Sequence, residues 1–221
     1  EDDTPRRIAR IEHGLIPEVR VKGEPAGRTI EEQLRAHHTP GVSVAIIHDH
    51  RVVAAKAYGV ADSATGTRLS DTTVMQAASV SKMFTALAAL KEVEAGKLGL
   101  DADVNRTLRS WKIPENDFTR ATPVTLKHLL SHTGGTNVPT LSQDGKSPTL
   151  LEVLEGKPPS LNRPVRVDAA PGKFRYSGGG TTIVQQMLVD VEGRPFPELM
   201  SAVVLTPLKL THSTFGDPQK V

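Results

Sequence analysis

Residues 75–86 read Met-Gln-Ala-Ala-Ser-Val-Ser-Lys-Met-Phe-Thr-Ala, and the interpretation of the whole chain starts from this stretch. Apolar residues recur at helical spacing from its middle onward, at Val80, Met83, Phe84, Leu87 and Leu90. Gly96 is well placed to follow the end of a helix, where glycine is common. The stretch therefore predicts a helix that begins near Ser79 and ends before Gly96.

Ser79 and Lys82 form the pattern S-x-x-K at the start of this helix. Residues three apart share one helix face, so the lysine amine can lie beside the serine hydroxyl. A buried lysine can lose its proton near neutral pH and then act as a base. The first helical turn also favours a developing alkoxide, and the backbone N–H of Ser79 can donate to an oxyanion. The bare pattern also fits a helix cap followed by a surface lysine.

Tyr176 is a second candidate for the same chemistry. It follows Pro171-Gly-Lys-Phe-Arg175, a turn that leads the chain to the tyrosine. A phenol near a lysine can carry a proton between a nucleophile and a leaving group. The alternative is a loop tyrosine that only packs on a neighbour.

The segments before Ser79 predict a polar N-terminal arm followed by an antiparallel hairpin. The arm covers residues 1–28, with some helix at 8–15, and a capped helix starts at Thr29. Residues 42–47 predict a buried strand and 52–60 a second strand, joined by a short polar link. Residues 29–74 would form the first part of an α/β domain.

The segments after the nucleophile helix predict mainly helices. Short helices are expected at 98–108 and at 125–131, where Gly134-Gly135 stops the second one. Residues 136–175 hold several prolines and glycines and should be mostly irregular. Further helices are expected at 181–191 and 196–204. We expect residues 75–195 to form a mainly helical domain and 196–221 to return toward the α/β domain.

Composition narrows the function classes. The 221 residues are 38% hydrophobic, enough for one or two compact domains, and their formal net charge is only +2. Without a basic run, nothing indicates nucleic-acid binding, and no apolar run reaches the roughly 20 residues that span a bilayer. The absence of cysteine excludes disulfides and thiolate catalysis. The chain opens with Glu-Asp-Asp-Thr-Pro, which fits a mature form, so we expect a periplasmic or secreted protein.

Four segments together resemble a known family. They are 75–86, then Leu126-Lys-His-Leu-Leu-Ser-His132-Thr-Gly-Gly, then Pro171-Gly-Lys-Phe-Arg-Tyr176-Ser-Gly-Gly-Gly, and finally Leu205-Thr-Pro-Leu-Lys-Leu-Thr-His-Ser-Thr-Phe215. This ordered series is similar to the beta-lactamase-related serine hydrolases, which include class C beta-lactamases, D-alanyl-D-alanine carboxypeptidases, D-aminopeptidases and esterases. The resemblance implies an α/β fold with an antiparallel sheet flanked by helices plus a mostly helical domain, incomplete in this chain.

The resemblance also implies roles for four residues. Ser79 would be the acylated nucleophile, with Lys82 and Tyr176 jointly as its activators, because the base in S-x-x-K enzymes is disputed. Gly178 would line the substrate site at the third position of the Tyr motif, where the family often has an asparagine. Its lack of a side chain favours a D-amino-acid peptidase or esterase over a beta-lactamase. The alternative is an inactive binding or structural module that keeps the fold.

One expected motif is missing after Tyr176. Relatives carry Lys-Thr-Gly or His-x-Gly on a strand that supplies a second oxyanion donor, and no such motif follows here. His132-Thr133-Gly134 has the right letters but precedes the tyrosine, so we interpret it as a loop anchor. We therefore expect a C-terminal fragment or second subunit to complete the sheet and the site. The alternative is a chain that simply ends early.

No cofactor or metal is predicted. His128 and His132 are four apart, but no glutamate gives the H-E-x-x-H pattern between them. The glycines at 178–180 lack the spacing of a nucleotide-binding loop. Their expected role is to let the backbone pass close to the site. The only ligand expected is a small acyl or peptide substrate.

Overall fold

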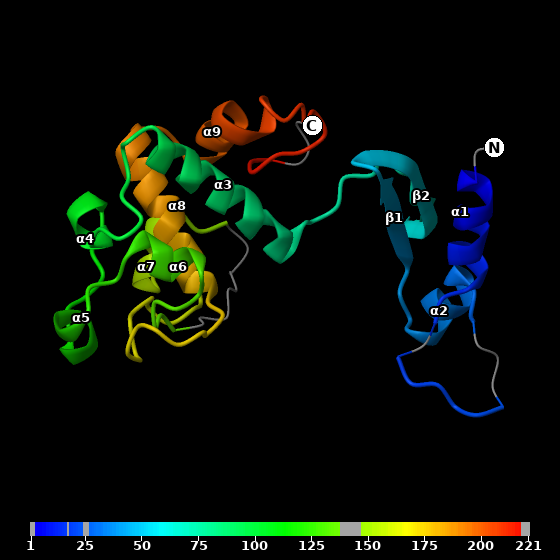
Figure 1. Cartoon of the computed structure of the whole chain (residues 1–221), viewed down its shortest axis with the longest axis horizontal. Helices are drawn as coiled ribbons and strands as arrows, with labels where there is room; N and C mark the ends of the chain where they lie inside the picture. Colours follow the sequence, from blue (N-terminus) through cyan, green and yellow to red (C-terminus); the bar gives the residue numbers. More distant parts are fainter. Residues whose placement is uncertain (1–2, 17, 24–26, 138–146, 218–221) are drawn as a thin grey trace. The chain divides into compact units, whose positions relative to one another are not determined.

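The computed structural model of the chain describes residues 3–16, 18–23, 27–137 and 147–217. Parts of three predicted segments, 1–28, 136–175 and 196–221, therefore lie outside the described residues. The chain divides into two compact units, Glu1–Met75 and Gln76–Val221, which we call unit 1 and unit 2 (Figure 1). Each unit is described by itself.

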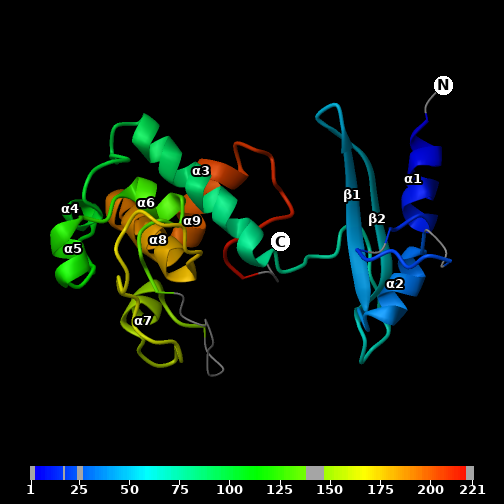
Figure 2. The ribbon, with the colours of Figure 1, turned by 60° about the horizontal axis from the view of Figure 1, so that its bottom comes forward.

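Unit 1 is a small antiparallel sheet with two helices on one of its faces (Figures 1 and 2). Its strands lie in the order β1-β2-β3, and its elements in chain order are α1 (Thr4–His13), α2 (Ile30–Ala36), β1 (Gly41–His48), β2 (Arg51–Asp62) and β3 (Thr67–Arg68). A capping box between Thr29 and Glu32 begins α2, as the sequence predicts.

The predicted hairpin is confirmed. β1 pairs with β2 from Gly41↔Gly59 to His48↔Arg51, with a register shift between Ile46 and Ile47. Gly59 is required there, because its φ is +82° and a Cβ atom would lie 2.2 Å from the carbonyl oxygen of Pro40.

Residues 42–47 form a strand as predicted, but the prediction that this strand is buried is wrong. Helices α1 and α2 cover one face of the hairpin, so the side chains of β1 alternate between two environments. Val42, Val44 and Ile46 are half-buried, whereas Ser43, Ala45 and Ile47 are exposed.

Unit 2 is a helical assembly around α8 (Gly178–Glu192), against which α3 (Ser81–Glu94), α6 (Leu126–Leu130) and α7 (Leu150–Glu155) pack (Figures 1 and 2). Its remaining helical elements are η1 (Ala78–Val80), α4 (Val104–Thr107), α5 (Asp117–Ala121), α9 (Phe196–Met200) and the π-helical turn η2 (Ser201–Leu205).

The predicted nucleophile helix is confirmed as η1 followed by α3. Its end is a Schellman motif, in which Gly96 has φ +71° and donates to the carbonyl of Val93 at 3.0 Å. The N–H of Lys97 donates to the carbonyl of Glu92 at 2.9 Å, which completes the motif. The first turn is a tighter 3₁₀ turn rather than α-helix.

Three of the other predicted helices are confirmed, and one is much shorter than predicted. The helices at 125–131, 181–191 and 196–204 are confirmed as α6, α8 and α9 with η2, but 98–108 contains only the four residues of α4. Helix α7 lies in the segment predicted to be mostly irregular. The sequence does carry signals for this helix: Thr149 and Glu152 form a capping box at its start, and Gly156 ends it with φ +65°.

One contiguous hydrophobic core lies in unit 2 and is centred on α8. Ile183, Met187 and Leu188 of α8 are at most 1% exposed, as are Leu126 of α6 and Leu199 of α9. No helix among the described residues is long and apolar enough to cross a bilayer. The sheet of unit 1 and the helices of unit 2 confirm the predicted α/β class.

Candidate active site

The S-x-x-K pattern lies at the junction of η1 and α3. The Lys82 amine donates a hydrogen bond to Ser79 Oγ at 2.9 Å, as the three-residue spacing predicts. Ser79 is exposed, so a substrate can reach its hydroxyl, and Lys82 is half-buried, so burial alone does not make it the buried base considered above. Ala78, just before the serine, has φ +44°, an uncommon conformation for a residue with a side chain.

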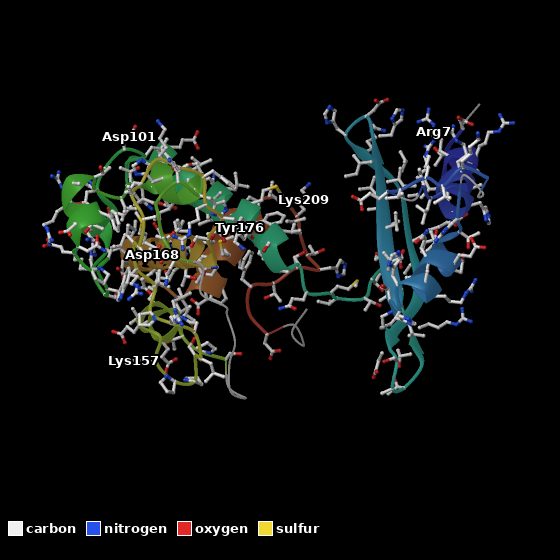
Figure 3. The ribbon with its side chains drawn as sticks, turned by 90° about the horizontal axis from the view of Figure 1, so that it is seen from below. Arg7, Asp101, Lys157, Asp168, Tyr176 and Lys209 are labelled. Carbon is white, nitrogen blue, oxygen red and sulfur yellow. The ribbon has the colours of Figure 1, made fainter. Side chains whose placement is uncertain are left out.

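Tyr176 comes from a distant part of the sequence to the same hydroxyl. Its phenol O–H donates to Ser79 Oγ at 2.7 Å, and the Lys82 amine lies 5.0 Å from the centre of its ring. In Figure 3 the labelled Tyr176 lies beside the start of α3. The structure thus brings the three residues predicted to act together into one hydrogen-bonded cluster.

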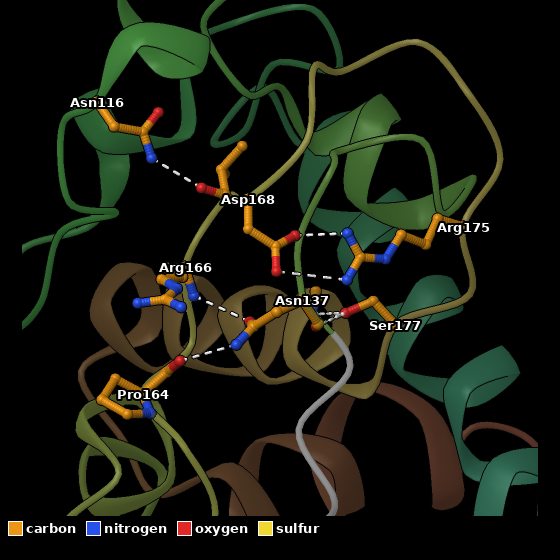
Figure 4. A network of polar contacts seen from close by, with 9 residues as sticks. Asn116, Asn137, Pro164, Arg166, Asp168, Arg175 and Ser177 are labelled. Atoms are coloured by element: carbon orange, nitrogen blue, oxygen red, sulfur yellow. Dashed lines mark hydrogen bonds and ion pairs between the residues drawn. The ribbon is translucent and has the colours of Figure 1, made fainter.

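The loop that carries Tyr176 is held against the end of α6. The N–H of Gly172 donates to the carbonyl of Thr133 at 2.8 Å, and the N–H of Arg175 donates to the carbonyl of His132 at 2.7 Å. The Arg175 guanidinium also pairs with Asp168 (Figure 4). These bonds fix the backbone on the N-terminal side of the tyrosine.

The C-terminal side of Tyr176 is fixed by Ser177, which caps α8. Ser177 is buried; its Oγ accepts from the N–H of Gly180 at 3.0 Å and donates to the carbonyl of Asn137 at 2.7 Å. The Asn137 side chain in turn accepts from the N–H of Arg166 and donates to the carbonyl of Pro164 (Figure 4). Ser177 is not among the residues predicted from the sequence, although a serine directly before a helix is a typical cap signal.

The glycines after Tyr176 begin helix α8, and Gly178 is its first residue. A Cβ atom on Gly179 would lie 2.9 Å from Val165, and one on Gly180 would lie 3.1 Å from Thr136. These two glycines therefore let the start of α8 pack closely against Thr136 and Val165. The expected role, a close approach of the backbone to the site, stays a prediction. Gly178 is placed beside Tyr176 by sequence, and its substrate-binding role stays a prediction.

The charge of Lys82 acts on the phenol. Hydrogen bonding to Lys82, then to Ser79, lowers the pKa of Tyr176 below its usual value, and the lysine charge adds to this effect. In the described state Ser79 Oγ accepts from both partners. If either partner loses its proton, it becomes an acceptor for the serine hydroxyl.

The two histidines of the second motif each bind backbone. His128 Nδ1 accepts from the N–H of Thr125 at 3.3 Å, and His132 Nδ1 accepts from the N–H of Ser177 at 3.2 Å. The described residues hold no group of three or more His, Asp or Glu side chains suited to a metal ion. The loop-anchor interpretation of His132 agrees with these contacts, but its ring also lies 4.6 Å from that of Tyr176.

Comparison with known proteins identifies the family. The model of the beta-lactamase family matches residues 27–221. The chain belongs to the beta-lactamase family. The family resemblance inferred from the motifs is thereby confirmed.

Three relatives illustrate the range of this family. "Protein flp" from Staphylococcus aureus is 29% identical over 192 residues, which is 85% of this chain and 37% of the relative. The octameric penicillin-binding protein homologue from Pyrococcus abyssi superimposes with TM-score 0.70 and 28% identity, over 86% of this chain and 44% of that one. EstCE1, a hydrolase with promiscuous acyltransferase activity, gives TM-score 0.66 and 26% identity, over 94% and 52%. The chain therefore spans about half or less of each of these relatives.

Proposed function

We propose that this chain carries the acylation centre of a serine hydrolase, with Ser79 as nucleophile and Lys82 and Tyr176 as its joint activators. The observation that carries the proposal is the convergence of two hydrogen bonds on Ser79 Oγ, from Lys82 at 2.9 Å and from Tyr176 at 2.7 Å. These distances lie in the range that direct proton transfer needs.

The proposed reaction has two stages. Once Lys82 or Tyr176 has lost a proton, Ser79 Oγ attacks the carbonyl carbon of the substrate while its own proton passes to that member of the pair. The tetrahedral intermediate then collapses, its leaving group takes a proton from Tyr176, and an ester between Ser79 and the acyl group remains. Water, or an alcohol in a transfer reaction, then attacks this ester. Its proton passes through the Lys82–Tyr176 pair to Ser79 Oγ, and the acid or the new ester leaves.

The substrate classes proposed are a D-amino-acid peptide, a simple ester and a related acyl compound. Gly178 offers no side-chain amide to bind a substrate amide, so peptidase or esterase chemistry ranks above beta-lactamase chemistry. The similarity to a hydrolase with promiscuous acyltransferase activity supports acyl transfer as the reaction class. A binding module without turnover is the competing proposal, and loss of activity on removal of Ser79 distinguishes the two.

The second donor of the oxyanion hole is proposed to come from another polypeptide segment. Stabilising an oxyanion takes more than one donor, and Ser79 offers only its own backbone N–H. The share of each relative that this chain covers, between 37% and 52%, supports this proposal. Full activity is then expected only when that segment is present.

A fluorophosphonate probe read by intact mass tests the proposal. The wild-type protein should gain one probe adduct, and Ser79→Ala should gain none. Ser81→Ala is the matched control, because Ser81 lies two residues away in the same motif and outside the cluster, so its labelling should persist. Labelling that survives in Ser79→Ala would overturn the assignment of the nucleophile. An unlabelled wild type, with and without the complementary segment, would favour the binding module.

A further inference from the structure

His132 joins the end of α6 to the loop that carries Tyr176. Its φ of +56° is uncommon for a residue with a side chain, and such a conformation persists where surrounding contacts determine it. Those contacts lie on both sides of the tyrosine in the sequence. The carbonyl of His132 accepts from the N–H of Arg175, and its Nδ1 accepts from the N–H of Ser177.

The imidazole ring also contacts the aromatic residues of this loop. Its centre lies 4.6 Å from that of Tyr176 at an interplanar angle of 42°, and 6.1 Å from that of Phe174 at 88°. Both separations suit attractive aromatic pairs. Tyr176 is therefore held through its ring and through both of its neighbours in the chain, and all of these contacts go to one residue.

We propose that neutral His132 is a positioning residue that holds the Tyr176 hydroxyl on Ser79 Oγ, and that protonation of His132 releases the tyrosine. The inference rests on the proposed role of Tyr176, but it makes a claim about the fold that can be measured without turnover.

The physical reason lies in the acceptor atom. Nδ1 can accept the Ser177 N–H only while it carries no proton, so the bond selects the neutral ring with its hydrogen on Nε2. A proton on Nδ1 would point at the N–H of Ser177, so two donors would face each other with no acceptor between them. It would also add a positive charge near Lys82. The bond to Ser177 would break, and the backbone that places Tyr176 would lose its C-terminal attachment.

The charged and titratable groups around the ring favour the neutral form. Burial, followed by the charge of Lys82 on α3, lowers the pKa of His132 below its usual value near 6.5. From the loop, Tyr176 faces the ring with a phenol whose O–H donates to Ser79 Oγ, and the guanidinium of Arg175 is paired with Asp168. On α6, His128 binds the N–H of Thr125 instead. His132 therefore stays neutral near pH 7 and becomes charged only under more acidic conditions.

An NMR titration of the wild-type protein is the primary test. With histidine, tyrosine and backbone amides labelled, the His132 ring, the Tyr176 ring and the Ser177 amide should shift with one common midpoint below 6.5. If Tyr176 and Ser177 do not follow the His132 titration, the proposal is wrong. This measurement needs no variant and no activity.

Two matched variants assign the effect. His132→Asn offers a side-chain oxygen as acceptor, tolerates the left-handed backbone and does not titrate, so the shifts of Tyr176 and Ser177 between about pH 5 and 8 should disappear. His128→Asn makes the same exchange of a titratable Nδ1 acceptor for an amide oxygen, at a histidine of α6 that binds the N–H of Thr125, and should leave the shifts unchanged. Shifts that persist in His132→Asn would overturn the proposal.

The pH dependence of probe labelling tests the link to chemistry. As pH falls, the labelling rate of the wild type should decrease because two groups gain protons, His132 and the Lys82–Tyr176 pair. In His132→Asn only the pair remains to gain a proton, so the rate should depend less steeply on pH. His132→Leu, which has no acceptor, should label up to about 10²-fold more slowly at neutral pH, as expected for a misplaced catalytic group. Equal profiles for wild type and His132→Asn would reduce His132 to a loop anchor. An unlabelled wild type would instead count against the proposed function, and the NMR titration would still decide the role of His132.

Discussion

Unit 1 and unit 2 differ in how they use their apolar residues. Unit 2 encloses a continuous core around α8, whereas among the described residues of unit 1 only Ile30 and Leu69 are buried hydrophobic side chains. Ile47 and Val52 at the closed end of the hairpin are 69% and 64% exposed. The candidate site lies wholly in unit 2. The difference indicates that the tight geometry around Ser79 depends on a packed framework behind it, which α8 supplies because Tyr176 directly precedes its cap Ser177.

The largest expected effect is on turnover, which should depend on a serine of unit 2 and not on a serine of unit 1. Ser79→Ala should lower turnover of an activated ester by at least ~10³-fold, because the acyl acceptor is gone. Ser43→Ala, at an exposed position of β1 in unit 1, should leave turnover unchanged. Initial rates with a chromogenic ester, with the complementary segment present, measure both. A large loss in Ser43→Ala would place part of the chemistry in unit 1.

A smaller loss is expected from changes to the activating pair. Lys82→Arg keeps a positive charge but cannot release a proton, so activity should fall about 10²–10⁴-fold. Lys91→Arg, on the same helix and outside the cluster, is the matched control. Near-normal rates in Lys82→Arg would mean that Tyr176 alone takes the serine proton.

Truncating an apolar side chain should cost more stability in unit 2 than at the exposed end of the hairpin in unit 1. Leu188 is fully buried, so Leu188→Ala should lower the free energy of unfolding by about 2–5 kcal/mol. Ile47→Ala changes an exposed side chain and should stay within about 0.5 kcal/mol of wild type. Urea denaturation followed by circular dichroism measures both. A comparable loss in Ile47→Ala would show that the hairpin is covered in solution.

The subtlest contrast is spectroscopic, because the chain has two tyrosines and each unit holds one. Burial, with the bond to Glu12, raises the pKa of Tyr58 to about 12, whereas Lys82 lowers that of Tyr176. Ultraviolet titration should therefore show two steps, and Tyr176→Phe should remove the lower one. A single step near pH 10 would contradict both environments.

Acid should weaken unit 1 through the carboxylate that binds Tyr58. Glu12 also pairs with Lys56 at 2.7 Å, and these two bonds lower the pKa of Glu12. Since the folded-state pKa is the lower one, this stabilisation is present above the unfolded value near 4.5 and is lost as pH falls through the folded value. Amide exchange in α1 should accelerate in that window, and Glu12→Gln should remove the dependence. Unchanged exchange across the window would show that α1 is held by other contacts.

The sequence by itself determined the elements whose signals are local. Helical spacing after Ser79 and the glycine at 96 specify α3. The caps at Thr29 and Thr125 specify α2 and α6. Each of these signals depends on contacts within one or two helical turns. The same locality placed Lys82 beside Ser79. It also left α7 detectable from its capping box, although the prolines and glycines around it favoured an irregular segment.

The family resemblance predicted that Tyr176 acts with Ser79, but only the tertiary structure decided how these distant residues meet. Tyr176 reaches Ser79 across 97 positions because Ser177 caps α8 and the preceding loop binds the end of α6. No periodicity encodes that meeting, and none predicts that the His132 ring lies against the tyrosine. The half-exposure of β1 has the same origin. A strand's alternation specifies two faces, but only the packed helices determine which face is covered.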